Sequence, residues 1–142
     1  MLLTFRGLHQ VTGCSGHYAS RATVWLSPAA TVTWWDNSAE QLFGFTSAEI
    51  VGQTSIGTFI PPIESGGRSL ADLLRDICTS PRSYSLNFNE NQSKSGERFW
   101  MLWINIPQHD ATGDFTGVFC FGIRTEETEL FKPLVQLWQS KF

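Results

Sequence analysis

The sequence predicts an α+β domain built on a five-stranded antiparallel sheet with short helices on one face. Three observations support this fold class. Two short segments rich in β-branched and aromatic residues come first, helix signals with N-terminal caps follow, and three long extended segments separated by turns come last. Strands from both ends of this order can share one sheet, and the helices between them then cover one of its faces.

The first two strands are expected to form a hairpin. Thr23–Leu26 and Thr31–Trp35 consist mainly of β-branched and aromatic residues, which favour strands. The four residues between them, 27–30, read Ser-Pro-Ala-Ala and indicate a turn.

Two short helices are predicted directly after this hairpin. Asn37 and Glu40 have the spacing of a capping box, and Gly44 is placed to end the first helix in a left-handed conformation. Thr46 and Glu49 repeat the capping-box spacing for the second helix.

The strongest helical pattern lies further along, where Ser69 is expected to be the N-cap. The apolar residues after it recur at the spacing of one helix face, and they are Leu70, Leu73, Leu74, Ile77 and Cys78.

Three antiparallel strands follow the helices. Residues 86–91 alternate with a period of two, 99–106 form a long aromatic and aliphatic run, and 115–123 form another. The segments between them, 93–96 and 110–114, are typical of turns. We therefore divide the chain into an N-terminal lead-in or cap (1–21), the domain (22–125) and a C-terminal helical linker (126–142).

Composition excludes several classes of function. Only 16% of the 142 residues are charged and the net charge is −3, with no basic run, so no nucleic-acid partner is expected. No apolar stretch approaches the roughly 20 residues needed to cross a bilayer, and we expect no membrane contact by this segment. The three cysteines, Cys14, Cys78 and Cys120, are widely spaced and odd in number, which favours reduced thiols and a cytoplasmic location.

Several segments resemble the PAS family of sensor domains. Residues 33–46 (T-W-W-D-N-S-A-E-Q-L-F-G-F-T) are similar to the strand-to-helix segment of that family, and 47–52 (S-A-E-I-V-G) to its continuation. Residues 94–100 (K-S-G-E-R-F-W) are similar to the family pattern K-x-G-x-x-x-W, followed at the expected spacing by Pro107, Asp110 and Gly113.

The resemblance covers residues 22–126 and implies the PAS fold. It is weakest at its end, because residues 122–126 read G-I-R-T-E where the family usually ends in D-I-T-E. In many members of the family, the aspartate at this place is similar to a latch that holds the last strand to the linker of an effector domain. This chain lacks that aspartate, so the resemblance does not indicate how a signal would leave the domain.

The identity of any cofactor remains unknown from the sequence, but two kinds are argued against. A flavin-cysteinyl adduct of the light-oxygen-voltage type needs a cysteine in the segment that here spans 54–61, which has none. Axial-histidine haem binding needs a histidine on the long helix, and 68–79 contains none. We interpret His9, His17 and His109 as surface residues rather than metal ligands.

The resemblance also implies a ligand-binding face. Alignment through the shared Lys-x-Gly turns one set of side chains into the space between helices and sheet. In the alternative register, Leu86 and Phe88 face the core and the asparagines face solvent, since a shift by one residue reverses every side chain. The residues expected to bind ligand are Trp35, Asn87, Asn89, Asn91, Met101, Trp103, Asn105, Val118 and Cys120.

In the same register the other face of the sheet is apolar, and an isolated domain would expose it. Three candidates could cover this face: the lead-in, a second copy of the domain, or the stripe of Leu130, Leu134 and Trp138. PAS domains commonly pair through this surface, so we expect a homodimer. The residues of this outer face are Phe88, Trp100, Leu102, Ile104, Phe119 and Phe121.

Two functions are consistent with these patterns. The first is the sensory module of a signal-transduction protein, which binds a small ligand and relays the change through a flanking helix. The effector domain is expected outside this chain and is of the histidine kinase type, as in a sensor histidine kinase, or of the diguanylate cyclase type. The second is a homodimerisation or protein-interaction module without a cofactor. No catalytic motif supports an enzyme.

Overall fold

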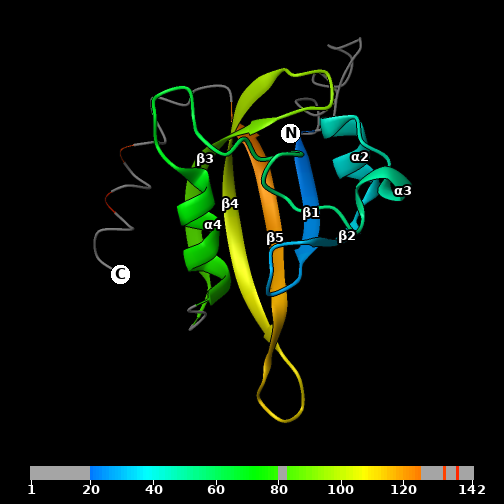
Figure 1. Ribbon diagram of the computed structural model, residues 1–142, viewed down its shortest axis with the longest axis vertical. Coiled ribbons are helices and arrows are strands. Elements are labelled where there is room, and N and C mark those ends of the chain that lie inside the picture. The colour runs from blue at the N-terminus through cyan, green and yellow to red at the C-terminus, as the bar shows by residue number, and fades with distance from the viewer. Residues whose placement is uncertain (1–19, 80–82, 126–132, 134–136, 138–142) are drawn as a thin grey trace, which may run out of the picture.

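The computed structural model describes residues 20–79, 83–125, 133 and 137. They form one five-stranded antiparallel sheet in the order β2-β1-β5-β4-β3, so the strands from the two ends of the domain meet at the centre (Figure 1). The predicted α+β class is confirmed. The strands are β1 (Arg21–Leu26), β2 (Val32–Trp35), β3 (Ser85–Gln92), β4 (Arg98–His109) and β5 (Phe115–Thr125), and the helices are α2 (Asn37–Phe43), α3 (Ser47–Ile50) and α4 (Leu70–Thr79).

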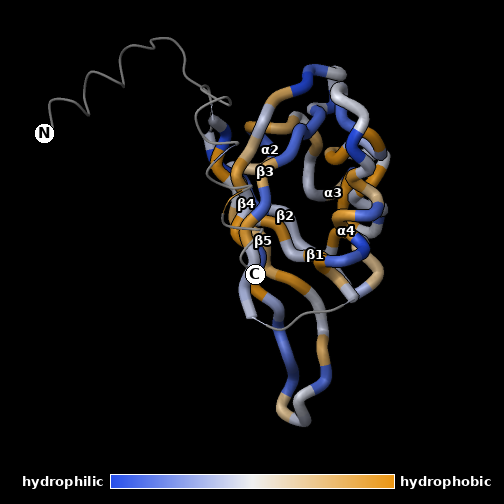
Figure 2. The backbone as a smooth tube through the Cα atoms, turned by 90° about the vertical axis from the view of Figure 1, so that its left-hand side faces the viewer, coloured by the Kyte–Doolittle hydropathy of each residue, from blue (hydrophilic) through white to orange (hydrophobic). Residues whose placement is uncertain are grey.

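The three helices lie on one side of the sheet, as Figure 2 shows edge-on. The apolar face of α4 turns toward the sheet with Leu70, Leu74 and Cys78 buried. The predicted N-cap of this helix is confirmed, because the Ser69 hydroxyl accepts a hydrogen bond from the Asp72 amide (3.2 Å).

The start of α2 differs from the prediction by one residue. Asp36, and not Asn37, is the N-cap: its carboxylate accepts from the amides of Ala39 (2.7 Å) and Thr23 (3.2 Å). Asp36 thereby links the start of α2 to strand β1. Glu40 does not complete a capping box either, since its carboxylate accepts from the Ser47 amide (2.6 Å) and links α2 to α3.

The capping box of α3 and the end of α2 are as predicted. The Thr46 side chain accepts from the Glu49 amide, and the Glu49 carboxylate accepts from the Thr46 amide. Gly44 ends α2 with φ +85°, in the left-handed region that favours glycine.

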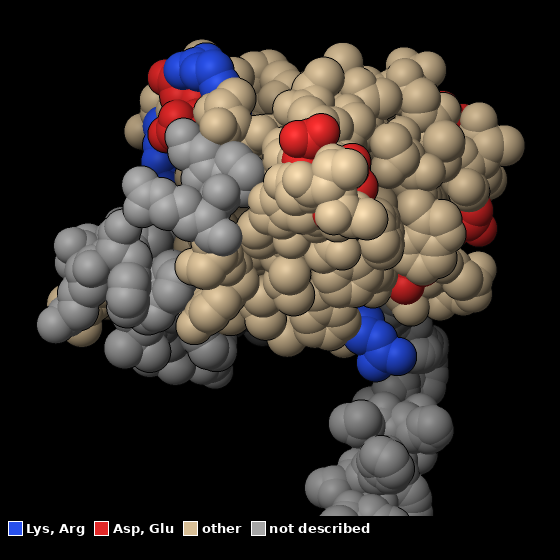
Figure 3. Space-filling view, turned by 90° about the horizontal axis from the view of Figure 1, so that it is seen from below, with Lys and Arg blue, Asp and Glu red and all other residues tan. Residues whose placement is uncertain are grey.

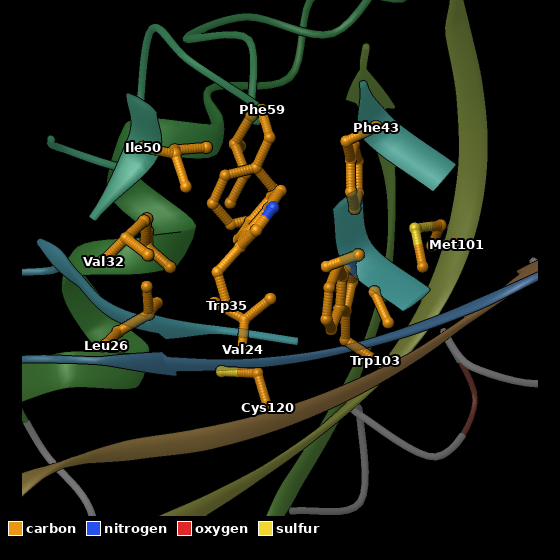
Figure 4. Packing of buried hydrophobic residues seen from close by; sticks show 14 of the residues in the cluster. Val24, Leu26, Val32, Trp35, Phe43, Ile50, Phe59, Met101, Trp103 and Cys120 are labelled. Carbon is orange, nitrogen blue, oxygen red and sulfur yellow. The ribbon is translucent and has the colours of Figure 1, made fainter. Parts of the chain in front are cut away.

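The core between helices and sheet is aromatic at the end where α2 and α3 pack. The rings of Trp35, Phe43 and Phe59 lie 5.1–5.3 Å from one another, and Phe99 packs on Phe43 at 5.5 Å. Figure 4 shows Trp35 of β2, Phe43 of α2 and Phe59 of the stretch before α4 converging in this core.

Some predictions fall outside the described residues. They are the lead-in 1–21 except for its last two residues, Cys14, His9 and His17, and the stripe of Leu130, Leu134 and Trp138. Within the described part of the chain, no helix is long and apolar enough to cross a membrane.

Candidate functional site

Four strand residues form a polar row on the helix side of the sheet. Asn87 pairs with Trp103 across β3 and β4, Asn89 pairs with Met101, and Asn91 pairs with Phe99. Asn87, Asn89, Asn91 and Asn105 are all at least 95% buried. The structure therefore has the register in which the asparagines face the helices.

Three amides of this row, those of Asn105, Asn87 and Asn89, are joined head to tail. The Asn105 amide nitrogen donates to Asn87 Oδ1 (2.6 Å), and the Asn87 amide nitrogen donates to Asn89 Oδ1. The Asn89 amide nitrogen ends the chain by donating to the Glu90 carbonyl (2.9 Å). At the other end, Asn105 also donates to Ser85 Oγ (3.3 Å). Buried amides are stable only when they are paired in this way.

A small cavity of about 20 Å³ separates this row from α4. About 10–15 Å³ is enough for one water molecule, so the cavity as it stands holds roughly one. Asn87, Asn89, Asn105 and Trp103 line its polar side, and aliphatic side chains of α4 line the other. Among the described residues, none of those lining the cavity is charged. The remaining lining residues are Val24, Leu26, Phe59, Ile60, Leu70, Leu73, Leu74, Ile77 and Cys120.

One polar group of the lining has no partner. Trp103 is 4% exposed, and its Nε1 donates to no acceptor within the described residues. A buried donor without an acceptor costs about 1–3 kcal/mol. An acceptor on a bound molecule would remove that cost.

The other predicted ligand-binding residues have different positions. Trp35, Met101 and Asn91 are buried in the core without lining the cavity, and the Trp35 indole donates to the Phe45 carbonyl (2.9 Å). The side-chain oxygen of Asn91 also lacks a partner within the described residues.

Val118 lines a second space, a groove of about 180 Å³ at the C-terminal end of α4. Ile77 and Asn105 line both the groove and the cavity. The other groove residues are Asp76, Ser83, Ser85 and Pro107.

Two buried thiols lie in this core. Cys120 on β5 lines the cavity, and Cys78 on α4 is 3% exposed. Burial raises the pKa of the Cys78 thiol to about 11. Burial, and secondarily the neighbouring Cys78, raises the pKa of Cys120 as well. Both groups are therefore neutral thiols near pH 7, which are poor nucleophiles and metal ligands.

The outer face of the sheet carries the second predicted set. Phe88 is buried and stacks on Trp100 with ring centroids 5.2 Å apart. Trp100, Leu102, Ile104, Phe119 and Phe121 are half-buried. Ile106 and Ile123, which prediction did not assign to this face, are 39% and 40% exposed.

Other cavity residues were also missed. Phe59 and Ile60 belong to the irregular stretch before α4, where no periodic pattern exists to assign a face. A buried ion-pair network between this stretch and β3, built on Glu64 and Glu90, was likewise not predicted. Within the described residues, no group of three possible metal ligands is found.

Comparisons with known proteins agree with this architecture. A family model described as PAS fold matches residues 18–125. Among solved structures, the chain is similar to the crystal structure of the PAS domain of a protein from Colwellia psychrerythraea, with 13% sequence identity and a TM-score of 0.59. The similarity covers 75% of this chain and 87% of that one, and at this identity it shows the fold alone. No curated protein matches the chain.

Proposed function

Because the chain belongs to the PAS-fold family, we propose that it is a sensory module that binds a small ligand between α4 and the sheet. The buried amides of Asn87, Asn89 and Asn105, which line the cavity, support this proposal, and so does the unpartnered indole nitrogen of Trp103, a residue that also lines it. A core that served packing alone would have apolar side chains at these positions, because buried polar groups are costly unless satisfied.

The ligand that this lining favours is small and uncharged. Amides and an indole N–H offer hydrogen bonds but no counter-charge, so a buried carboxylate, phosphate or ammonium group would be left unpaired. A ligand larger than one water molecule requires α4 to move away from the sheet. Binding then shifts the position of the helix, which is a means of signalling.

We place the module in the cytoplasm, in a longer signal-transduction protein such as a sensor histidine kinase. The resemblance of residues 33–52 and 94–100 to PAS sensor segments supports this context, and so do the free thiols of Cys78 and Cys120. The output would pass through the segment after β5.

Ligand retention tests the proposal. The protein is purified without denaturation and analysed by native mass spectrometry, then again after unfolding. We expect a small molecule that is present only in the native sample and is lost in Trp103→Phe, which removes the indole N–H but keeps a ring. Trp25→Phe is the matched control, because Trp25 is 37% exposed on the outer face. Equal retention in both variants, or no bound molecule, would contradict the proposal.

A second candidate is a homodimerisation or protein-interaction module. The small cavity and the half-exposed apolar outer face favour it. Sedimentation velocity tests it: Ile123→Glu should convert dimers to monomers. Val51→Glu is the control, since Val51 is equally exposed (41%) on the helix side of the domain. A monomeric native protein would count against pairing through this face.

A further inference from the structure

We propose that small molecules enter the cavity through the groove at the C-terminal end of α4, and that the Ile77 side chain separates the two spaces. The inference rests on the proposed ligand binding, but it can be tested without a ligand. It follows from a difference between the two ends of α4.

The N-terminal end of α4 is held against the edge strand by a buried carboxylate network. Glu64, six residues before the helix, is 8% exposed, and its carboxylate accepts from Arg68 Nε (3.1 Å) and Nη2 (2.8 Å). The same carboxylate accepts from the Glu90 amide on β3 (3.1 Å). Arg68 Nη2 also donates to the Phe88 carbonyl (2.6 Å).

A second carboxylate extends the network. Glu90 is 6% exposed and accepts from the amide (2.8 Å) and the hydroxyl (3.0 Å) of Ser65. Arg98 Nη1 donates to Glu90 (3.2 Å) and to the Ile63 carbonyl (3.3 Å). Opening the cavity at this end would break the hydrogen bonds of Glu64 to the Glu90 amide and of Glu90 to Ser65, and buried polar groups left without partners are costly.

Among the described residues, a groove of about 180 Å³ adjoins the C-terminal end of α4 instead. The helix runs downward in Figure 1 to this end, where the groove lies between it and the sheet. Seen from below, most of the described surface is uncharged, with acidic and basic side chains in scattered groups (Figure 3), and Asp76 is the one charged residue among the described residues of the groove. No network like that of Glu64 and Glu90 joins the helix end to the groove residues within the described part of the chain.

The sheet surface is continuous from the groove into the cavity. On β5, Val118 lines the groove, and Cys120, two residues on, lines the cavity. On β3, Ser85 and Asn87 have the same relationship. Because side chains two residues apart share a face of the sheet, the groove and the cavity lie along one path under α4.

Two side chains lie where these spaces meet. Asn105 is held by its hydrogen bonds to Ser85 and Asn87. Ile77 is half-buried on α4 and its side chain has no polar atom, so its rotation breaks no hydrogen bond. Ile77 is therefore the side chain that can move aside.

The thiol of Cys120 reports on this path. Cys14→Ser and Cys78→Ala leave Cys120 as the single thiol, and methyl methanethiosulfonate is the probe because it is small and uncharged. Burial leaves only a small thiolate fraction of Cys120, so labelling is slow and its rate is compared between variants at one pH. The thiolate attacks the thiosulfonate sulfur, forms a mixed disulfide with the S–CH₃ group and releases methanesulfinate. Mass spectrometry of the intact protein gives the rate of labelling.

Matched truncations on α4 distinguish the two ends. Leu73 lines the cavity but not the groove, whereas Ile77 lines both. After correction for the unfolding free energy of each variant, we expect Ile77→Ala to speed labelling by about tenfold more than Leu73→Ala. Ile77→Trp should slow it. Glu64→Gln should speed labelling no more than its loss of global stability explains.

The opposite pattern would overturn the inference. Equal rates for Ile77→Ala and Leu73→Ala would show that Ile77 does not separate the spaces. Acceleration by Glu64→Gln beyond its effect on global stability would place the entrance at the N-terminal end of α4. Neither result depends on ligand retention, so this inference and the proposed function can fail separately.

Discussion

The indole ring of Trp103 packs against the backbone of Gly122, its direct partner across β4 and β5. A Cβ at position 122 would lie 2.7 Å from Cε3 and Cζ3 of the indole and 2.7 Å from Cε of Met101. Such distances are far inside van der Waals contact. The missing side chain at Gly122 therefore makes the space in which Trp103 lies beside the cavity.

Gly122→Ala should destabilise the domain by about 1–3 kcal/mol, the usual cost of overpacking a core. The methionine methyl group can move aside, but the rigid indole cannot do so without shifting the cavity wall. Urea denaturation gives the change in unfolding free energy. Gly66→Ala is the control, because a Cβ at Gly66 meets nothing within 4 Å. Equal stability of the two variants would contradict the packing described for Trp103.

The N-cap of α2 can be assigned by mutation. Asp36→Ala removes the acceptor of two amides, so it should cost about 1–2 kcal/mol. Asn37→Ala should leave the stability nearly unchanged, since Asn37 is exposed at the first helical position. Thermal unfolding of both variants gives the comparison. A larger loss in Asn37→Ala would restore the cap that the sequence predicts.

Two glutamates in ion pairs should differ greatly in their effect on stability. Glu64→Ala leaves the Glu90 amide without its acceptor and Arg68 without its ion-pair partner, and should cost about 3 kcal/mol or more. Glu49→Ala removes an ion pair to Lys94 in which both side chains are more than 40% exposed, together with the exposed hydrogen bond from the Thr46 amide, and its effect should be smaller. Guanidinium or urea unfolding measures both. Similar losses would mean that burial of Glu64 matters little.

The Cys78 thiol should make stability depend on pH in the alkaline range. Burial raises its pKa from an ordinary value of about 9 to about 11. The stabilisation is complete below about pH 9 and is lost as pH rises toward 11, at no more than about 1.4 kcal/mol per pH unit. Cys78→Ala should flatten the fall in unfolding free energy between pH 9 and 10.5. Parallel curves for the two proteins would contradict this prediction.

The sequence predicts the strands well but leaves the face of β3 open. In residues 86–91 amide side chains alternate with Leu86, Phe88 and Glu90, and the structure buries or half-buries both sets. The asparagines lie on the helix side, while Phe88 is covered on the outer side, where it stacks on Trp100. Polarity cannot assign the faces of such a strand. Only its pairing and the packing of the helices do so.

The stretch before α4 could not be assigned for a different reason. Residues 62–69 carry no period, and their conformation depends on contacts with β3, which lies more than twenty residues later in the chain. The N-cap of α2 was misplaced for a simpler reason, because Asp36 and Asn37 are adjacent and both are good caps. Short-range sequence patterns therefore predict the helices and strands, but they do not predict the hydrogen bonds between segments that are distant in the chain.

The network of Glu64 and Arg68 also decides how copies of the domain could associate. β3 is an edge strand, and edge strands with free backbone groups can pair with another chain. Here the Glu90 amide, the Phe88 carbonyl and the Gln92 amide already have partners in the segment 59–68. Strand addition is blocked along this part of the sheet, which protects the domain from open-ended aggregation there. Two copies that associate near β3 must therefore do so through the faces of their sheets and not by pairing of their edge strands.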